Sequence, residues 1–195
     1  RRHGAQLWVA LPDRDRHVAP FFEHAEPTPF RVGDATLRVF VGELAGSDPS
    51  PVRTFTDLVG AQLDLPAGAS VDLPVNPHFE HGLLVDAGSA LLDGTEVPGA
   101  HLGYRGPGAT VLRVSAGDAP LRALLLGGEP LGEPIVMWWN FIGRDHDDIV
   151  AYRTQWQSDV IDGADPAGRF GHVAGWDGSA LPAPALPTVR LKPRD

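Results

Sequence analysis

The chain has 195 residues, a formal net charge of -9, 43% hydrophobic residues and no cysteine. The hydrophobic fraction supports a packed core and argues against global disorder. The negative charge argues against direct binding to nucleic acid, which needs clustered lysine and arginine, and no apolar run approaches the roughly eighteen residues of a membrane span. Without cysteine there is neither a disulfide framework nor a thiolate metal site, which fits a cytoplasmic location.

The first predicted element is an apolar, strand-like run at residues 5–12, AQLWVALP, which proline closes. Residues 13–29 follow as a charged stretch interrupted by prolines, and we expect an extended linker there.

Short apolar segments bounded by turn residues fill residues 30–142. They include ATLRVFVGEL, FEHGLLVDAG, ATVLRVSAG and PLRALLLGGEP. Their spacing of roughly ten residues is typical of an antiparallel sandwich or barrel. Turn dipeptides such as Asp93-Gly94 and Pro107-Gly108 favour hairpin connections. The sequence therefore predicts an all-β fold over this range.

A single helix is predicted within residues 143–195. Asp145 can cap its first turn, and Ile149, Tyr152, Trp156 and Val160 recur at helical spacing as one apolar stripe. We expect this stripe to pack against the sheets. Beyond Gly163 the Pro-rich sequence predicts an extended tail, because proline fits neither a helix interior nor a central strand.

The stretch LLLGGEPLGEPIVMWWNFIGRDHDDIVAYRTQWQ closely resembles the C-terminal part of bacterial pirin-family proteins. Three further stretches agree with the family: HGAQLWVALP, LPAGASVDLPV with FEHGLLVDAG, and RFGHVAGWDG with LPAPALPTVRLKPR. The resemblance implies a cupin β-sandwich, or jelly-roll barrel, followed by the helix and the extended tail.

Pirins are bicupins whose first barrel carries a metal, usually iron. The resemblance places that barrel before residue 1, so residues 1–12 would be the last strand of an otherwise absent N-terminal cupin, and the chain would be a processed or truncated piece. Quercetin dioxygenase activity and redox-dependent contact with transcription factors belong to that first barrel, so they transfer to no residue here.

A metal site in this barrel would need its own histidines and a carboxylate. The cupin ligand positions fall near Pro74, Asn76, Glu80 or His81, and Val111 or Leu112, so most hold residues that cannot bind a metal. We therefore expect no metal, cofactor-binding or catalytic residue in this chain. The alternative is a rebuilt site that uses His78, Glu80, His81 and His101, although strand alternation places His78 and Glu80 on one face and His81 on the other.

Trp138 and Trp139 offer a second alternative, an aromatic platform for a flat ligand such as a flavonoid. Adjacent residues on an extended segment point in opposite directions. We therefore expect one Trp in the core and the other at an inter-barrel contact, so that this Trp-rich joint is structural.

Residues 1–12 carry Leu7, Trp8 and Val9, which would be exposed unless another chain covers them. We expect them to bind an N-terminal cupin, another protein partner or a second copy of the chain. Three functions follow: a non-catalytic structural and partner-binding regulatory cupin, a quercetin 2,3-dioxygenase-like enzyme whose metal half lies outside this chain, or a small-molecule-binding barrel.

Overall fold

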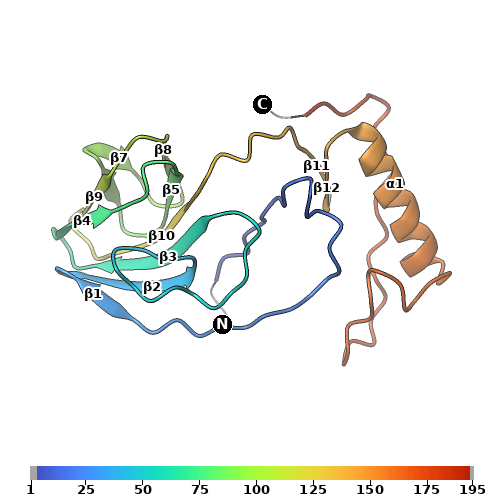
Figure 1. Cartoon of the computed structure of the whole chain (residues 1–195), viewed down its shortest axis with the longest axis horizontal. Coiled ribbons are helices and arrows are strands. Elements are labelled where there is room, and N and C mark those ends of the chain that lie inside the picture. The colour runs from blue at the N-terminus through green and yellow to red at the C-terminus, as the bar shows by residue number, and fades with distance from the viewer. Residues whose placement is uncertain (1–3, 194–195) are drawn as a thin grey trace. The chain divides into compact units, whose positions relative to one another are not determined.

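The computed structural model describes residues 4–193, which divide into two compact units. We call residues 22–130 the barrel unit, and residues 4–21 with 131–193 the helical unit. Figure 1 labels the elements of both units. Among the described residues, no helix combines the length and the apolar character that a membrane span requires.

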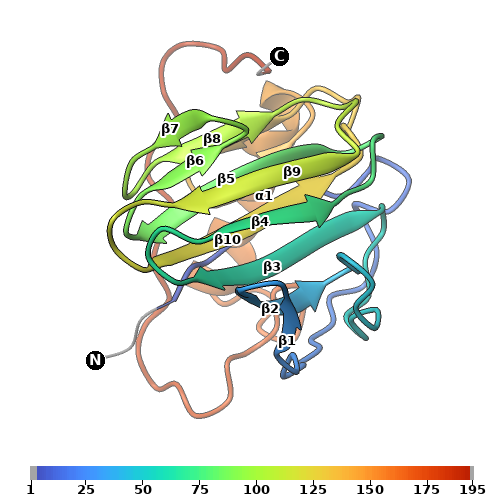
Figure 2. The same ribbon diagram turned by 90° about the vertical axis from the view of Figure 1, so that its left-hand side faces the viewer.

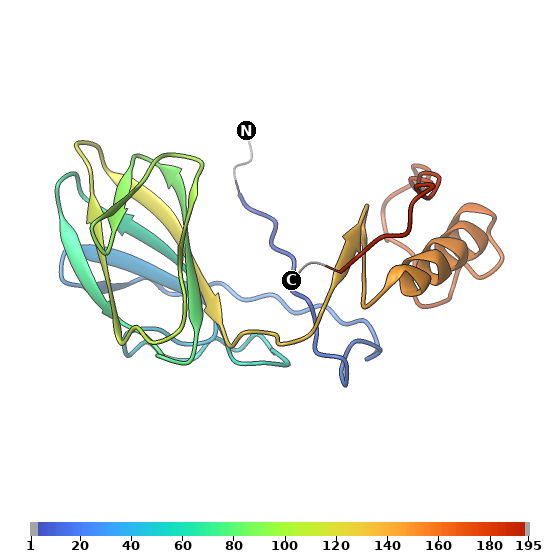
Figure 3. The same ribbon diagram turned by 90° about the horizontal axis from the view of Figure 1, so that it is seen from above.

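The barrel unit is a sandwich of two antiparallel sheets. One sheet has six strands in the order β1-β2-β3-β10-β5-β8, and the other has four in the order β4-β9-β6-β7. Figure 2 looks onto these strands, and Figure 3 views the same unit from above. The strands are β1 (Phe30–Val32), β2 (Ala35–Val41), β3 (Leu58–Leu65), β4 (Ser70–Pro74), β5 (Glu80–Ala87), β6 (Ala90–Leu92), β7 (Thr95–Val97), β8 (Leu102–Arg105), β9 (Val111–Ala116) and β10 (Leu121–Gly128).

The chain passes back and forth between the two sheets. Because side chains alternate along a strand, each strand directs every second side chain into the interior that the two sheets share. Leu63, Leu83 and Leu125 project from the six-stranded sheet, while Leu73 and Leu112 project from the other; all are 0% exposed. Burying each such leucine contributes about 1.5–3 kcal/mol. The expected all-β cupin sandwich is therefore confirmed.

The barrel ends earlier than residue 142, where the sequence placed its boundary. Its last strand, β10, stops at Gly128, and residues 131–142 belong to the helical unit. Pro130 and Pro134 cannot donate to a strand ladder, and Gly132 has a φ of 66°. These residues release the chain from the sheet.

The helical unit contains a small hairpin and one helix. The hairpin pairs β11 (Val136–Trp138) with β12 (Phe141–Gly143), and the helix α1 spans His146–Trp156. The predicted cap is confirmed: Asp145 Oδ1 accepts a hydrogen bond of 2.9 Å from the Asp148 backbone N–H. A π-helical turn, η1 (Gln157–Ile161), continues the helix.

Within its own unit, the apolar stripe of α1 packs against the hairpin and the tail. Ile149 is fully buried in a cluster with Val136, Phe141 and Ala183. The tail is held there by polar contacts, because Trp156 Nε1 donates 2.9 Å to a tail carbonyl, that of Leu181. The hairpin and the tail thus supply the apolar partner that the stripe needs.

Residues 4–12 form no strand, and residues 1–3 of the predicted terminal strand lie outside the described part. A strand needs a neighbouring edge for its backbone hydrogen bonds, and the described residues pair none with this segment. Its end is instead fixed by side chains: Glu133 accepts from the Asp13 N–H at 2.9 Å, and Arg144 donates to the Leu11 carbonyl. Residues 13–29, the predicted linker, contain turns but neither helix nor strand.

Candidate functional site

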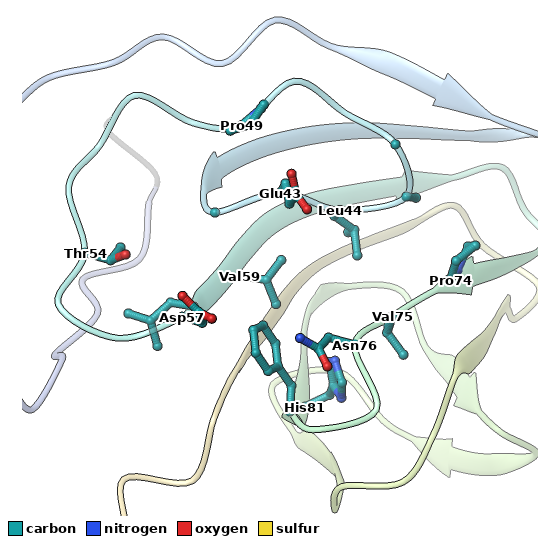
Figure 4. Close-up of a pocket in the computed structure, with 15 residues that line it drawn as sticks. Glu43, Leu44, Pro49, Thr54, Asp57, Val59, Pro74, Val75, Asn76 and His81 are labelled. Carbon is teal, nitrogen blue, oxygen red and sulfur yellow. The ribbon is translucent and has the colours of Figure 1, made fainter.

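A cavity of about 620 Å³ opens at one end of the barrel unit, where β2 and β4 end and β3 and β5 begin. We call it the His81 cavity (Figure 4). Its walls combine apolar and polar groups in similar measure. The lining residues are Gly42, Glu43, Leu44, Ala45, Gly46, Pro49, Thr54, Asp57, Leu58, Val59, Pro74, Val75, Asn76, Phe79 and His81.

His81 is a polar side chain at an inward position of β5. The burial pattern of β5 alternates, so His81 shares the interior face with Leu83 and Val85 and is 2% exposed. Its partner on the neighbouring strand β10 is Gly127. A Cβ atom at residue 127 would lie 2.9 Å from His81 Cδ2, so the missing side chain of Gly127 leaves the space that the imidazole fills.

Neither ring nitrogen of His81, Nδ1 or Nε2, has a hydrogen-bond partner among the described residues. Burial lowers the pKa of His81 below its ordinary value of 6.5, since the imidazolium would lose its hydration. The ring is therefore neutral at pH 7 and can donate one hydrogen bond and accept another. The Phe79 ring lies beside it, 6.2 Å between centroids.

Four further polar side chains line the cavity: Glu43, Thr54, Asp57 and Asn76. Asn76 Oδ1 accepts a 2.9 Å hydrogen bond from the His78 backbone N–H, which fixes the loop before β5. Glu43 and Asp57 add carboxylates from the two ends of the loop that joins β2 to β3. No lysine or arginine is among the residues that line the cavity. The lining therefore combines apolar side chains with two carboxylates and contains no cationic side chain.

The four candidate metal ligands do not converge. His78 is exposed in the turn before β5, while Glu80 points away from the core and accepts 2.7 Å from the Tyr104 hydroxyl. His101 is exposed, with Nδ1 2.8 Å from the Gly99 carbonyl oxygen, and only His81 faces the interior. Strand alternation separated Glu80 from His81 correctly, but the strand starts after His78, so alternation does not apply to that residue.

The remaining cupin ligand positions also fail to offer donors. Pro74 ends β4, Val111 is exposed and Leu112 is fully buried among aliphatic side chains. Within residues 4–193, no group of three or more His, Cys, Asp and Glu side chains is placed to hold a metal ion. His81 is the one histidine that lines the cavity, and the Glu43 and Asp57 carboxylates do not form a ligand group with it, so the described residues do not fit the mixed nitrogen and oxygen shell that a cupin metal requires.

The family relationship rests on sequence as well as on this fold. Residues 60–161 match the model of the pirin C-terminal cupin domain. This chain belongs to the pirin family. The match includes β4 to β10 together with α1, so a pirin signature covers parts of both units.

Individual pirin relatives agree with this assignment. A Pseudomonas aeruginosa protein, provisionally named a quercetin 2,3-dioxygenase, is 37% identical over 95% of this chain and 56% of its own length. A pirin-like protein of Caulobacter vibrioides is 31% identical over 81% of this chain and 54% of its own. The crystal structure of a quercetin 2,3-dioxygenase from Acinetobacter baumannii superposes with a TM-score of 0.80 at 33% identity, covering 94% of this chain and 59% of that one. The chain thus spans little more than half of these pirins.

The Trp-rich joint of this pirin differs from the expectation for it. Both Trp138 and Trp139 pack around the helical unit's core cluster and neither is fully buried. The reason is the tight turn at Trp139 and Asn140, where Trp139 has a φ of 50° and simple strand alternation fails. Trp139 also lines a second cavity of about 600 Å³, with Trp156, Phe170 and Trp176.

Parts of the His81 cavity were not predictable as a site. Glu43, Thr54 and Asp57 lie in loops without any motif that marks them. The pair Gly127-Gly128 gave the one usable signal, because glycine inside a strand indicates a close approach by a neighbouring group.

Proposed function

We propose that this chain is the non-catalytic C-terminal cupin of a pirin-type protein, with a structural and partner-binding regulatory role. The donor set of the barrel carries this proposal: its interior holds one neutral histidine, while His78, Glu80 and His101 point elsewhere. The described residues also include no group of three or more His, Asp and Glu side chains placed to hold a metal ion, which supports a non-catalytic role.

Metal loading tests the proposal. The purified chain is incubated with Fe²⁺, Ni²⁺ or Zn²⁺, desalted and analysed by inductively coupled plasma mass spectrometry. We expect well below one ion per chain, with no difference between the wild type and His81→Ala. A stoichiometric ion that His81→Ala removes would overturn the proposal, because it would place a metal centre inside this barrel.

A metal-dependent dioxygenase is the second candidate, and the names of the relatives favour it. Two proteins named for quercetin 2,3-dioxygenase align with 94–95% of this chain, yet the chain covers only 56% and 59% of them. The activity would then need residues outside this chain. Oxygen uptake with quercetin and Fe²⁺ tests this: we expect this chain alone to match the rate of the metal without protein, and a rate above that background would favour an enzymatic barrel.

The partner-binding part of the proposal rests on an exposed apolar segment. Leu7, Trp8 and Val9 are 41%, 48% and 55% exposed, and they are consecutive in a segment without secondary structure. Apolar side chains exposed in a row favour coverage by another surface. We propose a further cupin, a protein partner or a second copy of the chain as that surface, and the cytoplasm stays the expected location.

A further inference from the structure

We propose that the His81 cavity binds a small uncharged molecule that carries a hydroxyl group, with the His81 imidazole as its hydrogen-bond partner at the inner end. This inference goes beyond the structural and partner-binding role and does not depend on it. It also needs no metal.

The unsatisfied imidazole is the first observation that points to a ligand. Buried polar groups in folded proteins are nearly always hydrogen-bonded, because an unpaired one has lost its water and gained nothing. His81 is 98% buried, and both of its ring nitrogens lack a protein partner in the described part of the chain. The other inward residues of β5, Leu83 and Val85, are aliphatic. A polar group from outside the chain is the missing partner.

The space around His81 is the second observation. The ring lines the wall of a cavity of about 620 Å³, within the range of small-molecule sites, roughly 300–1,000 Å³. Figure 4 shows His81, Asn76 and Val75 together on one side of the cavity, and Glu43 and Asp57 elsewhere around it. Gly127 leaves room for the ring, because a Cβ at residue 127 would lie 2.9 Å from His81 Cδ2. The same Cβ would lie 2.9 Å from the Glu80 carbonyl oxygen. The cavity is therefore large enough for a ligand, and the imidazole is part of its wall.

The lining selects the chemical class. A neutral imidazole both donates and accepts, and so does a hydroxyl group. The carboxylates of Glu43 and Asp57 line the cavity without any lining lysine or arginine, which disfavours an anion. An ammonium group would lose its hydration against the apolar part of the lining, which includes Leu44, Val59 and Phe79. An uncharged alcohol with an apolar ring or chain avoids both costs.

Asn76 supplies an additional anchor. Its side-chain oxygen is already bonded to the His78 N–H, so its amide nitrogen is the group left to donate to a ligand oxygen. The hydroxyl of Thr54 lines the same cavity and can donate or accept. A ligand with a second hydroxyl group would therefore find partners near the opening as well as at His81.

Three probes of one skeleton test the proposal: benzyl alcohol, benzoate and benzylammonium. Binding to the full chain at pH 7.5 is measured by saturation-transfer NMR, and the His81 ring is followed in long-range ¹H–¹⁵N spectra. We expect benzyl alcohol to bind and to shift the His81 ring signals. We expect the two charged probes to bind about tenfold more weakly than benzyl alcohol, a difference of roughly 1.4 kcal/mol in binding free energy.

Variants assign the binding to His81. We expect His81→Leu to weaken benzyl alcohol binding about tenfold, which is about the value of one buried hydrogen bond, and His81→Gln, which keeps a donor and an acceptor, to bind better than His81→Leu. The exposed His101→Leu is the matched control and should leave binding unchanged. Melting temperatures show whether each variant is folded. If His81→Leu does not fold, the comparison of His81→Gln with the wild type tests whether binding depends on His81.

The outcomes separate clearly. Three results would overturn the proposal. They are equal binding by the wild type and His81→Leu, tighter binding of either charged probe than of benzyl alcohol, and no binding of benzyl alcohol at about 10 mM. A dissociation constant of about 10 mM corresponds to a binding free energy of about 2.7 kcal/mol. The last result would mean that water alone satisfies the imidazole. None of these results bears on the metal analysis, so a failure here is distinguishable from a failure of the non-catalytic role.

Discussion

His81 places a titratable group where its neighbours on β5 are aliphatic, so its protonation is coupled to folding. The unfolded chain binds a proton at this imidazole near pH 6.5, whereas burial lowers the pKa in the folded state. Between those two values the unfolded state holds more protons, and folding stability therefore rises with pH. This His81-linked part of the folding stability is lost as the pH falls below about 6.5 toward the pKa of His81 in the folded state.

We predict that His81→Leu removes this part of the pH dependence. Between pH 7.5 and pH 5, the free energy of unfolding should fall less in His81→Leu than in the wild type, because leucine takes up no proton in either state. Urea unfolding at several pH values measures the difference. The exposed His101→Leu should keep the wild-type slope, and parallel slopes in all three proteins would contradict the prediction.

Gly127 makes room for the imidazole, so a methyl group at this residue has a specific cost. A Cβ atom there would meet His81, Val59 Cγ1 and the Glu80 carbonyl oxygen, each at 2.9 Å. We predict that Gly127→Ala destabilises the chain by about 1–3 kcal/mol, as overpacking does. Gly106→Ala is the control in the same unit, since its nearest neighbour, Tyr104, would lie at 3.8 Å. A change below about 0.5 kcal/mol in Gly127→Ala would show that the strands yield easily.

At the scale of elements, local sequence rules predicted the features that local interactions decide. Short apolar segments between turn residues predicted β2, β5, β9 and β10, because turn residues end a strand locally. The cap at Asp145 followed from the same kind of reasoning. The end of the barrel did not follow from local rules. A strand-like run such as residues 136–143 can join a larger sheet or form its own hairpin, and tertiary packing decides which pairing forms.

The cap of α1 gives an element-scale prediction. Asp145→Ala removes the acceptor of the Asp148 N–H and should destabilise the helical unit by about 0.5–2 kcal/mol. Thermal unfolding followed by far-ultraviolet circular dichroism measures the loss. Asp145→Asn retains a capping oxygen and should recover most of the stability. Equal melting of Asp145→Ala and the wild type would mean that packing around Ile149 holds the first turn unaided.

At the scale of the whole molecule, the longest family motif and the His81 cavity use different residues, although two shorter family-like stretches contribute Pro74, Val75, Phe79 and His81 to the cavity. The long motif at residues 124–157 indicated the family, and it lies largely in the helical unit. The His81 cavity is assembled from strand ends and loops that are distant in sequence. Family and fold were therefore predictable, whereas the cavity required the three-dimensional arrangement.

We predict association of the whole chain through Leu7, Trp8 and Val9. Size-exclusion chromatography with light scattering at micromolar concentration should give a dimer, or a complex when the N-terminal cupin of a pirin relative is supplied. Replacing Trp8 and Val9 by serine should abolish it, while Trp176→Ser, which alters another exposed aromatic residue, should not. A monomer in every case, with no binding of that cupin, would leave this segment without the proposed role.

The place of β10 in its sheet has a consequence for synthesis. It is the last strand of the barrel along the chain, yet it lies between β3 and β5. Neither of those strands can pair with this neighbour until residue 128 has left the ribosome, so β3 and β5 each keep an open edge until then, a state that favours aggregation. Messages that end before residue 128 should therefore yield insoluble polypeptide, while those that extend past it can close the sandwich.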